Sequence, residues 1–167
     1  MRIPLAFLSI LLLGMIGCSE KSEKKSGPST PKIVSEKKEI QISTQLLPDT
    51  VSTIGNLVWH SNIKESFLLA KEQDKNVIVM VGEDDCRWCV KMKKHTLTDE
   101  RIQDHMQKYI LVSIKRSDKD AISHVPEFDG NIPSFFFMDA NKEVIEPVVG
   151  YFKSDDFLDY IKEIEEL

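Results

Sequence analysis

The sequence predicts a single α/β domain in which a central mixed sheet has helices on both faces. The first observation behind this prediction is the alternation of helical and β-rich segments along residues 62–164, which is typical of layered α/β folds. The second is a pair of β-rich segments, 134–138 and 143–149, joined by a short polar turn. Such a pair predicts an antiparallel hairpin within the sheet.

The helices are expected where apolar residues recur at helical spacing. In residues 62–74, Asn62 and Glu65 have the spacing of a capping box, which predicts that a helix begins there. Asp155 and Asp156 suit the first turn of the last helix, because its N-terminus favours negative charge. The further helices are expected over residues 86–95, from Thr98 to about Lys108, and after a Ser154 cap.

The strands are expected where β-branched and aromatic residues cluster. Residues 77–81 form a continuous apolar run, which is typical of a central strand buried on both faces. Residues 109–115 form another β-rich run, and residues 117–131 are polar and irregular. Pro147 predicts an edge strand or a bulge, because proline donates no ladder hydrogen bond. Trp59 is expected in the core.

Composition limits the classes of function. The chain has 167 residues and a net charge of −5, so it has no basic surplus with which to neutralise phosphates. We therefore expect no nucleic-acid partner. The apolar fraction of 41% is enough for a packed core. Residues 18–45 are mildly basic and the rest is acidic, a division that we attribute to solubility.

The first residues have the pattern of an export signal. Arg2 precedes an apolar run, Leu5 to Ile16, whose length suits the apolar core of a signal peptide. The run is too short to span a bilayer, which takes about 20 apolar residues. Residues 19–45 are rich in Ser, Lys and Glu and contain no aromatic residue, so we expect a flexible tether. Residues 46–56 remain ambiguous and could pack on the domain.

Met15-Ile16-Gly17-Cys18 resembles the lipobox of bacterial lipoproteins, although Met15 stands where leucine is usual. The resemblance implies cleavage before Cys18, acylation of that cysteine and a membrane anchor. A plain secretory cleavage is the alternative. By resemblance to the sorting rules of enteric lipoproteins, Ser19 after the cysteine implies the outer membrane, with the domain facing the periplasm. The predicted organisation is a signal peptide (1–17), a lipidated Cys18 with its tether (18–45) and one folded domain (46–167).

Cys86 and Cys89 are the residues with the clearest chemistry. Two cysteines three positions apart at a helix start can close a small disulfide ring. The first cysteine faces the unpaired N–H groups of the first turn, which favour its thiolate. Cys86 would therefore form a mixed disulfide with a substrate, and the more shielded Cys89 would release it. Trp88, between them, suits a surface recognition contact, whereas Lys91, Lys93 and Lys94 suit a solvated face.

Residues from about 57 to 167 resemble the thioredoxin superfamily, and most of all its exported branch. The resemblance rests on Cys86-Arg87-Trp88-Cys89-Val90-Lys91-Met92, on the acidic helix start Thr98-Asp99-Glu100, on Asn131-Ile132-Pro133-Ser134 before a Phe-rich strand, and on Gly150. It implies a thioredoxin-like three-layer fold and thiol–disulfide exchange without a bound cofactor. It also implies that Pro133 is cis and lies against the cysteine pair, and that the backbone of Ile132 binds an incoming substrate strand.

Two departures from the superfamily pattern bear on the chemistry. Met80 stands where thioredoxins usually bury an acid that assists proton transfer from the resolving thiol, so Cys89 needs another base or solvent. In the loop Gly82-Glu83-Asp84-Asp85, three carboxylates would raise the pKa of Cys86, while Arg87 and the helix start would lower it. The redox potential does not follow from this balance.

Two other readings stay open. In the first, the cysteines bind copper or zinc, completed by His95, His105 or His124. The position of His95 opposes this, since it falls about 180° round the helix from Cys86. In the second, the domain is a non-catalytic binding module with a structural disulfide. A disulfide ring this short stabilises a fold little through chain entropy, which argues against a purely structural disulfide.

We expect a monomeric thiol–disulfide oxidoreductase that acts on exported cysteine-containing proteins and holds no metal. Exported compartments are oxidising, so a reductase would need a membrane electron-donor protein. The sequence does not choose between reduction, oxidation and isomerisation.

Overall fold

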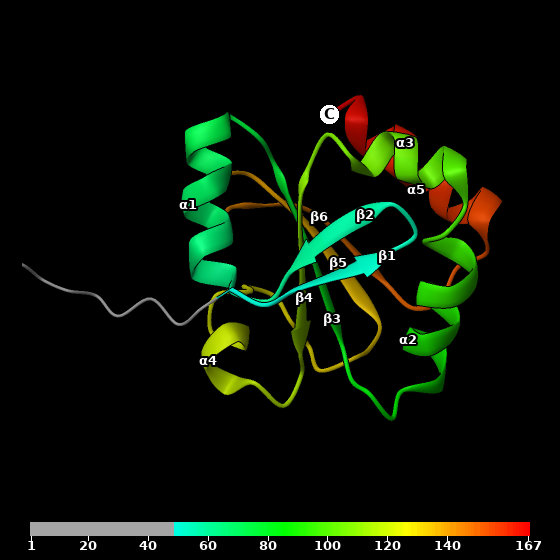
Figure 1. The fold of residues 1–167 in the computed structure, drawn as a ribbon, viewed down its shortest axis with the longest axis horizontal. Helices are drawn as coiled ribbons and strands as arrows, with labels where there is room; N and C mark the ends of the chain where they lie inside the picture. Colours follow the sequence, from blue (N-terminus) through cyan, green and yellow to red (C-terminus); the bar gives the residue numbers. More distant parts are fainter. Residues whose placement is uncertain (1–48) are drawn as a thin grey trace, which may run out of the picture. The chain divides into compact units, whose positions relative to one another are not determined.

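The computed structural model describes residues 49–167 (Figure 1). The predicted signal peptide, Cys18, the tether and residues 46–48 lie outside the described residues. In chain order the elements are β1 (Val51–Ile54), β2 (Leu57–His60), α1 (Ile63–Gln73), β3 (Val77–Gly82), α2 (Arg87–Lys91), the π-helical segment η1 (Met92–Thr96), α3 (Glu100–Met106), β4 (Ile110–Lys115), α4 (Lys119–Ile122), β5 (Ser134–Met138), β6 (Val144–Val149) and α5 (Ser154–Glu165).

The strands form one mixed sheet in the order β1-β2-β4-β3-β5-β6. Strand β3 pairs in parallel with β4 and antiparallel with β5, and every residue of β3 is buried. The expected hairpin is present as β5 and β6, and β6 is an edge strand that accommodates Pro147. The predicted mixed sheet with a buried central strand is confirmed.

Helices cover both faces of this sheet (Figure 1). On one face, α1 and α4 pack over an apolar cluster that includes Phe67, Val79 and Phe136. On the other face, η1, α3 and α5 pack over a larger cluster, and α2 leads into η1 on the same side. The fold is therefore the expected thioredoxin-like arrangement of three layers.

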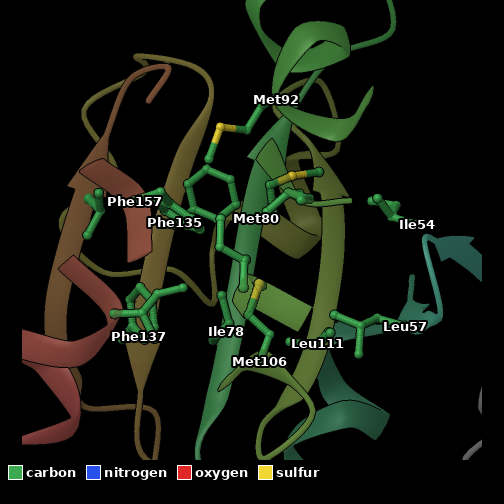
Figure 2. Packing of buried hydrophobic residues seen from close by; sticks show 14 of the residues in the cluster. Ile54, Leu57, Ile78, Met80, Met92, Met106, Leu111, Phe135, Phe137 and Phe157 are labelled. Carbon is green, nitrogen blue, oxygen red and sulfur yellow. The ribbon is translucent and has the colours of Figure 1, made fainter. Parts of the chain in front are cut away.

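The larger cluster extends from the sheet to the base of the cysteine-bearing helix (Figure 2). Met80 of β3 and Met92 of η1 are both fully buried in it. Phe135 of β5 packs on Phe157 of α5, with ring centroids 4.9 Å apart. Because Met92 lies only three residues after Cys89, this packing fixes the helix that carries the cysteine pair on the sheet.

Of the ambiguous residues 46–56, residues 51–54 form β1, which pairs with β2 in a hairpin that adds two strands to the sheet. Trp59 of β2 is buried, as expected. The side chain of Gln103, in α3, fastens the hairpin turn: its amide nitrogen donates to the carbonyls of Ile54 (3.1 Å) and Leu97 (2.9 Å). Its carbonyl oxygen accepts from the N–H of Asn56 at 2.9 Å.

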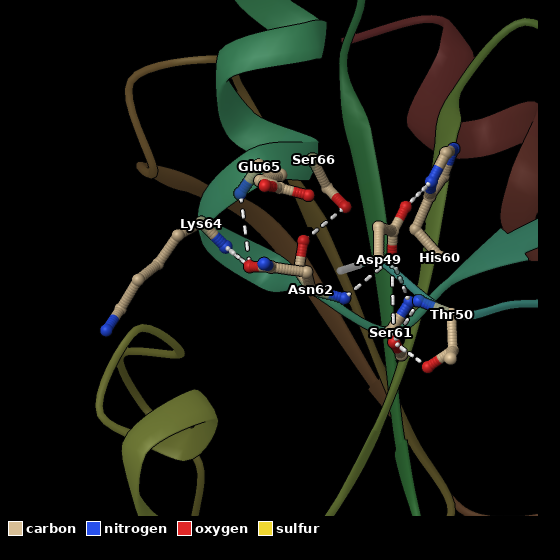
Figure 3. A network of polar contacts seen from close by, with 8 residues as sticks. All are labelled: Asp49, Thr50, His60, Ser61, Asn62, Lys64, Glu65 and Ser66. Atoms are coloured by element: carbon tan, nitrogen blue, oxygen red, sulfur yellow. Dashed lines mark hydrogen bonds and ion pairs between the residues drawn. The ribbon is translucent and has the colours of Figure 1, made fainter. Parts of the chain in front are cut away.

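Asp49 ties the start of the described chain to the beginning of α1 (Figure 3). Its carboxylate accepts from the N–H groups of Ser61 (3.0 Å) and Asn62 (3.1 Å) and from the ring of His60. Asn62 caps α1 as expected, since its side chain accepts from the N–H of Glu65 at 3.3 Å. These contacts close the β1–β2 hairpin against the first helix.

The predicted helix boundaries need four corrections. The helix expected over residues 86–95 is α-helical only to Lys91 and continues as η1. The next helix begins at Glu100, capped by Asp99 and not by Thr98. The region 117–131 contains α4, a short helix capped by Asp118. Finally, Ser154 is the first residue of α5 and not its cap, since Lys153 stands at the cap position and makes no side-chain cap hydrogen bond.

Candidate active site

The topology brings two loops together at one end of the central strands β3 and β5. Strand β3 ends at Gly82, and the loop that follows leads to Cys86 at the start of α2. Strand β5 runs antiparallel to β3, and Ser134 at its start pairs with Val81 at the end of β3. The loop that contains Pro133 therefore lies at the same end of the sheet as the loop that leads to Cys86. Two segments about 45 residues apart along the chain thus form one site.

Cys86 and Cys89 are joined by a disulfide, with their Cα atoms 5.2 Å apart. Cys86 occupies the cap position of α2, and its sulfur accepts from the N–H of Cys89 at 3.1 Å. Such an N–H donor stabilises negative charge on the Cys86 sulfur once the disulfide opens. The predicted pair at a helix start is thus present, although the α-helical part is short.

The two sulfurs differ in access. Cys89 is only 1% exposed, whereas Cys86 is partly exposed. A Cβ atom added to Gly82 would lie 3.4 Å from the sulfur of Cys89, so that sulfur packs directly against the backbone of β3. A substrate thiol or disulfide can therefore reach Cys86 more readily than Cys89.

The peptide bond between Ile132 and Pro133 is cis, as the resemblance implied. The carbonyl of Pro133 accepts from the N–H of Gly150 at 2.8 Å, which fixes the segment after β6 against the proline. Within residues 49–167, the backbone N–H and carbonyl of Ile132 have no hydrogen-bond partner. These two groups are therefore available to an added strand.

Trp88, Ile132 and Pro133 line one pocket of about 290 Å³. Its other lining residues are Gly150 and Tyr151. Trp88 is 47% exposed, as expected for a surface contact, and its ring stacks on Tyr151 with centroids 5.2 Å apart. The structure thus brings together all three of the residues that the sequence predicts for substrate binding. Tyr151 was not predicted, because one aromatic residue after a glycine carries no pattern of its own.

Cations lie over the aromatic wall of this pocket. The ammonium of Lys91 is 5.2 Å from the ring centroid of Trp88 and 4.6 Å from that of Tyr151. The guanidinium of Arg87 is 5.6 Å from the Trp88 ring. Such contacts each contribute about 0.5–1 kcal/mol at exposed sites, so they hold the aromatic pair in place. Of the three lysines expected on a solvated face, only Lys94 is exposed, and Lys91 and Lys93 are partly buried.

The acidic loop before Cys86 is partly turned toward β4. Asp84 forms an ion pair with Lys115, whose hydrogen bond and charge lower the pKa of this carboxyl group. Glu83 accepts from the N–H of Ser117 at 3.0 Å. Two of the three carboxylates expected beside Cys86 thus have partners of their own, which weakens the expected rise in the pKa of that cysteine.

The histidines considered as metal ligands have other neighbours. His105 pairs with Glu165 at 2.8 Å, and a nitrogen of His124 lies 3.3 Å from the ammonium of Lys142. His95 is exposed. Across the described part of the chain, no three His, Cys, Asp or Glu side chains come together as a metal site would require.

Comparison with known proteins agrees with the fold. A family model described as thioredoxin-like matches residues 58–140. A thioredoxin from Thermus thermophilus is 18% identical, with 61% of this chain and 82% of that one covered and a TM-score of 0.54. The reduced C-terminal domain of DsbD from Neisseria meningitidis is 19% identical (60% and 92% covered, TM-score 0.52). A DsbH oxidoreductase is 16% identical (73% and 94% covered, TM-score 0.54). No curated protein matches the sequence.

The fold and the cysteine pair together define an α/β protein of the thioredoxin type. The family model over residues 58–140 and the solved structures thus agree on a thioredoxin-like fold for this domain. Within residues 49–167, no helix has the length and apolar character needed to cross a bilayer.

Proposed function

We propose that this protein is a thiol–disulfide oxidoreductase that exchanges disulfides with exported cysteine-containing proteins. The observation that carries the proposal is the shared pocket: Trp88, between the two cysteines, and the cis Ile132–Pro133 segment line one cavity. A substrate strand bound along Ile132 would present its sulfur to the partly exposed Cys86. The thioredoxin-like relatives support the same chemistry.

The reaction requires only the two cysteines and the substrate. In the reducing direction, the Cys86 thiolate attacks a substrate disulfide, forms a mixed disulfide and expels one substrate thiolate. The Cys89 thiolate then attacks the sulfur of Cys86 and expels the second substrate thiolate. The substrate gains two electrons, the pair loses two, and the substrate thiolates take protons from water. The reverse sequence donates a disulfide to the substrate.

The direction depends on the compartment and on an electron donor. The apolar segment from Leu5 to Ile16 and the lipobox-like Met15 to Cys18 support export and a lipid anchor, with the domain facing the periplasm from the outer membrane. In an oxidising compartment, sustained reduction needs a membrane electron-donor protein. Such a donor would use the same exposed sulfur of Cys86.

Trapping in bacterial cells tests the exchange. In the full chain, Cys89→Ser leaves Cys86 without its resolving partner, so mixed disulfides with envelope proteins should accumulate and disappear on reduction. Cys86→Ser is the matched control and should trap none. The same cell fractions report the anchor, because the chain should partition with membranes and Cys18→Ser should move it to the soluble fraction. Equal trapping by both cysteine variants would contradict the assigned roles.

A further inference from the structure

Lys93 lies on the side of the helix that carries the buried sulfur. It follows Cys89 by four residues in the continuous helical segment of α2 and η1, and side chains at this spacing are neighbours on one helix face. Lys93 is half-buried, in contrast to the exposed Lys94 beside it. A lysine is seldom buried without a partner. The groups around Lys93 therefore matter for its role.

The opposite wall of this region is the end of the sheet. Gly82 faces the sulfur of Cys89, since a Cβ atom on it would lie 3.4 Å from that sulfur. Lys115 of β4 pairs with Gly82 in the parallel ladder, and residues paired in this way point to the same face of a sheet. The Lys115 side chain therefore lies on the face of the sheet that Cys89 packs against. Lys93 approaches the same region from the helix.

Within residues 49–167, Lys93 lies beside an ion pair but forms none itself. Asp84 and Lys115 form an ion pair that is neutral as a unit. Lys93 interacts electrostatically with both of them and adds one positive charge. Burial lowers the pKa of Lys93, the nearby Lys115 lowers it further, and Asp84 raises it. An ammonium group that is poorly solvated in this way is stabilised by a new anion close to it.

We propose that Lys93 is a positioning residue for the resolving step, in which its ammonium group stabilises the thiolate form of Cys89. The proposal rests on the proposed function for its use in exchange. It accounts for resolution in a chain whose buried position on β3 holds Met80, a side chain that can neither accept a proton nor carry charge. The other charged groups at this end of the sheet are Glu83, Asp84 and Asp85 of the loop, Arg87 of α2, and Lys115 and Arg116 at the end of β4.

In the resolving step, the Cys89 thiol first releases its proton to water. The resulting thiolate then attacks the sulfur of Cys86 in the mixed disulfide, closes the Cys86–Cys89 bond and expels the substrate thiolate. Lys93 changes neither the atoms nor the electrons of this step. It raises the fraction of Cys89 that is ionised at a given pH, and this fraction limits the attack.

Titration of Cys89 tests the proposal without any substrate. In the full chain with Cys18→Ser and Cys86→Ser, kept in neutral detergent, Cys89 is the only thiol. Its ionisation can be followed against pH by the resonance of a ¹³C-labelled cysteine Cβ. Lys93→Gln should raise the pKa of Cys89 by roughly one unit, a tenfold loss of thiolate below that pKa. Lys93→Arg keeps the charge, so the pKa of Cys89 in this variant should stay close to that of the parent.

Two further variants make the outcome decisive. Lys94→Gln removes an exposed charge from the same helix and should leave the titration unchanged. Lys115→Gln removes an exposed side chain, leaves Asp84 without its ion-pair partner, and should also raise the pKa of Cys89. If Lys93→Gln titrates like the parent while its near-ultraviolet circular dichroism shows a folded chain, the proposal is wrong. Exchange by the chain with both Cys86 and Cys89 is then measured separately and decides the proposed function.

Discussion

At the residue scale, Trp88 combines exposure with a fixed orientation. Nearly half of its surface is exposed, yet Tyr151 stacks on its ring and the ammonium of Lys91 lies over both rings. A rigid aromatic surface of this kind binds a partner with little loss of side-chain entropy. Because Trp88 lines the pocket with the Ile132–Pro133 segment, we expect a substrate strand bound along that segment to contact it.

Trp88→Ala should therefore lower kcat/KM for a protein disulfide roughly tenfold, the effect of truncating an aromatic anchor worth about 1.4 kcal/mol. The reduction of a small disulfide that does not fill the pocket should change much less. Tyr160→Ala removes an exposed aromatic residue outside the pocket and is the control. Equal losses for protein and small-molecule disulfides would argue against a recognition role.

The sequence predicted the site residues whose spacing is itself a signal. Cys86 and Cys89 stand out by their separation, and Pro133 by its place before a Phe-rich strand. Tyr151 and Lys93 gave no comparable signal, because their importance depends on neighbours that are distant in the sequence. The half-buried state of Lys93 in particular depends on how the helix packs on the sheet, which a run of lysines does not indicate.

At the element scale, the β1–β2 hairpin depends on one side chain of α3. Gln103 is buried and satisfies three backbone groups in the hairpin turn and at Leu97. The turn contains Gly55 at φ +61°, and a Cβ atom there would lie 1.5 Å from the amide nitrogen of Gln103. The turn and the glutamine thus require each other.

Gln103→Ala should lower the free energy of unfolding by about 2–3 kcal/mol, since it leaves buried backbone groups without hydrogen-bond partners. Urea denaturation measures this loss. Gln107→Ala, an exposed change in the next turn of the chain, should stay within about 0.5 kcal/mol of the parent. A Gln103→Ala protein as stable as the Gln107→Ala protein would show that the hairpin does not depend on this contact.

The elements that the sequence missed share one physical cause. The central strand β3 and the helix α1 were predictable because apolar periodicity and a cap lie within one short segment. The hairpin, the π-helical turn of η1 and the start of α5 depend on contacts between segments far apart. Thr96 in η1, for example, is buried and its hydroxyl donates to the carbonyl of Phe152 at 2.6 Å, a tie that no local pattern predicts.

At the scale of the whole molecule, the sheet order explains why the site forms where it does. The end of β3 and the beginning of β5 meet because the two strands are antiparallel neighbours at the centre of the sheet. The two apolar clusters on its faces hold this centre rigid. The cysteine pair therefore follows β3 and the cis-proline segment precedes β5, the two strands whose residues are all buried.

The central claim is that Cys86 and Cys89 form a redox-active pair. The most direct measurement is its reduction potential, obtained by equilibrating the full Cys18→Ser chain in detergent with glutathione buffers, with Cys86→Ser as the control. The account predicts a reversible two-electron transition that the control lacks. A potential near about −270 mV would identify a reductase fed by a donor, and one near about −120 mV a donor of disulfides. A pair that exchanges with no buffer in this range would contradict the account.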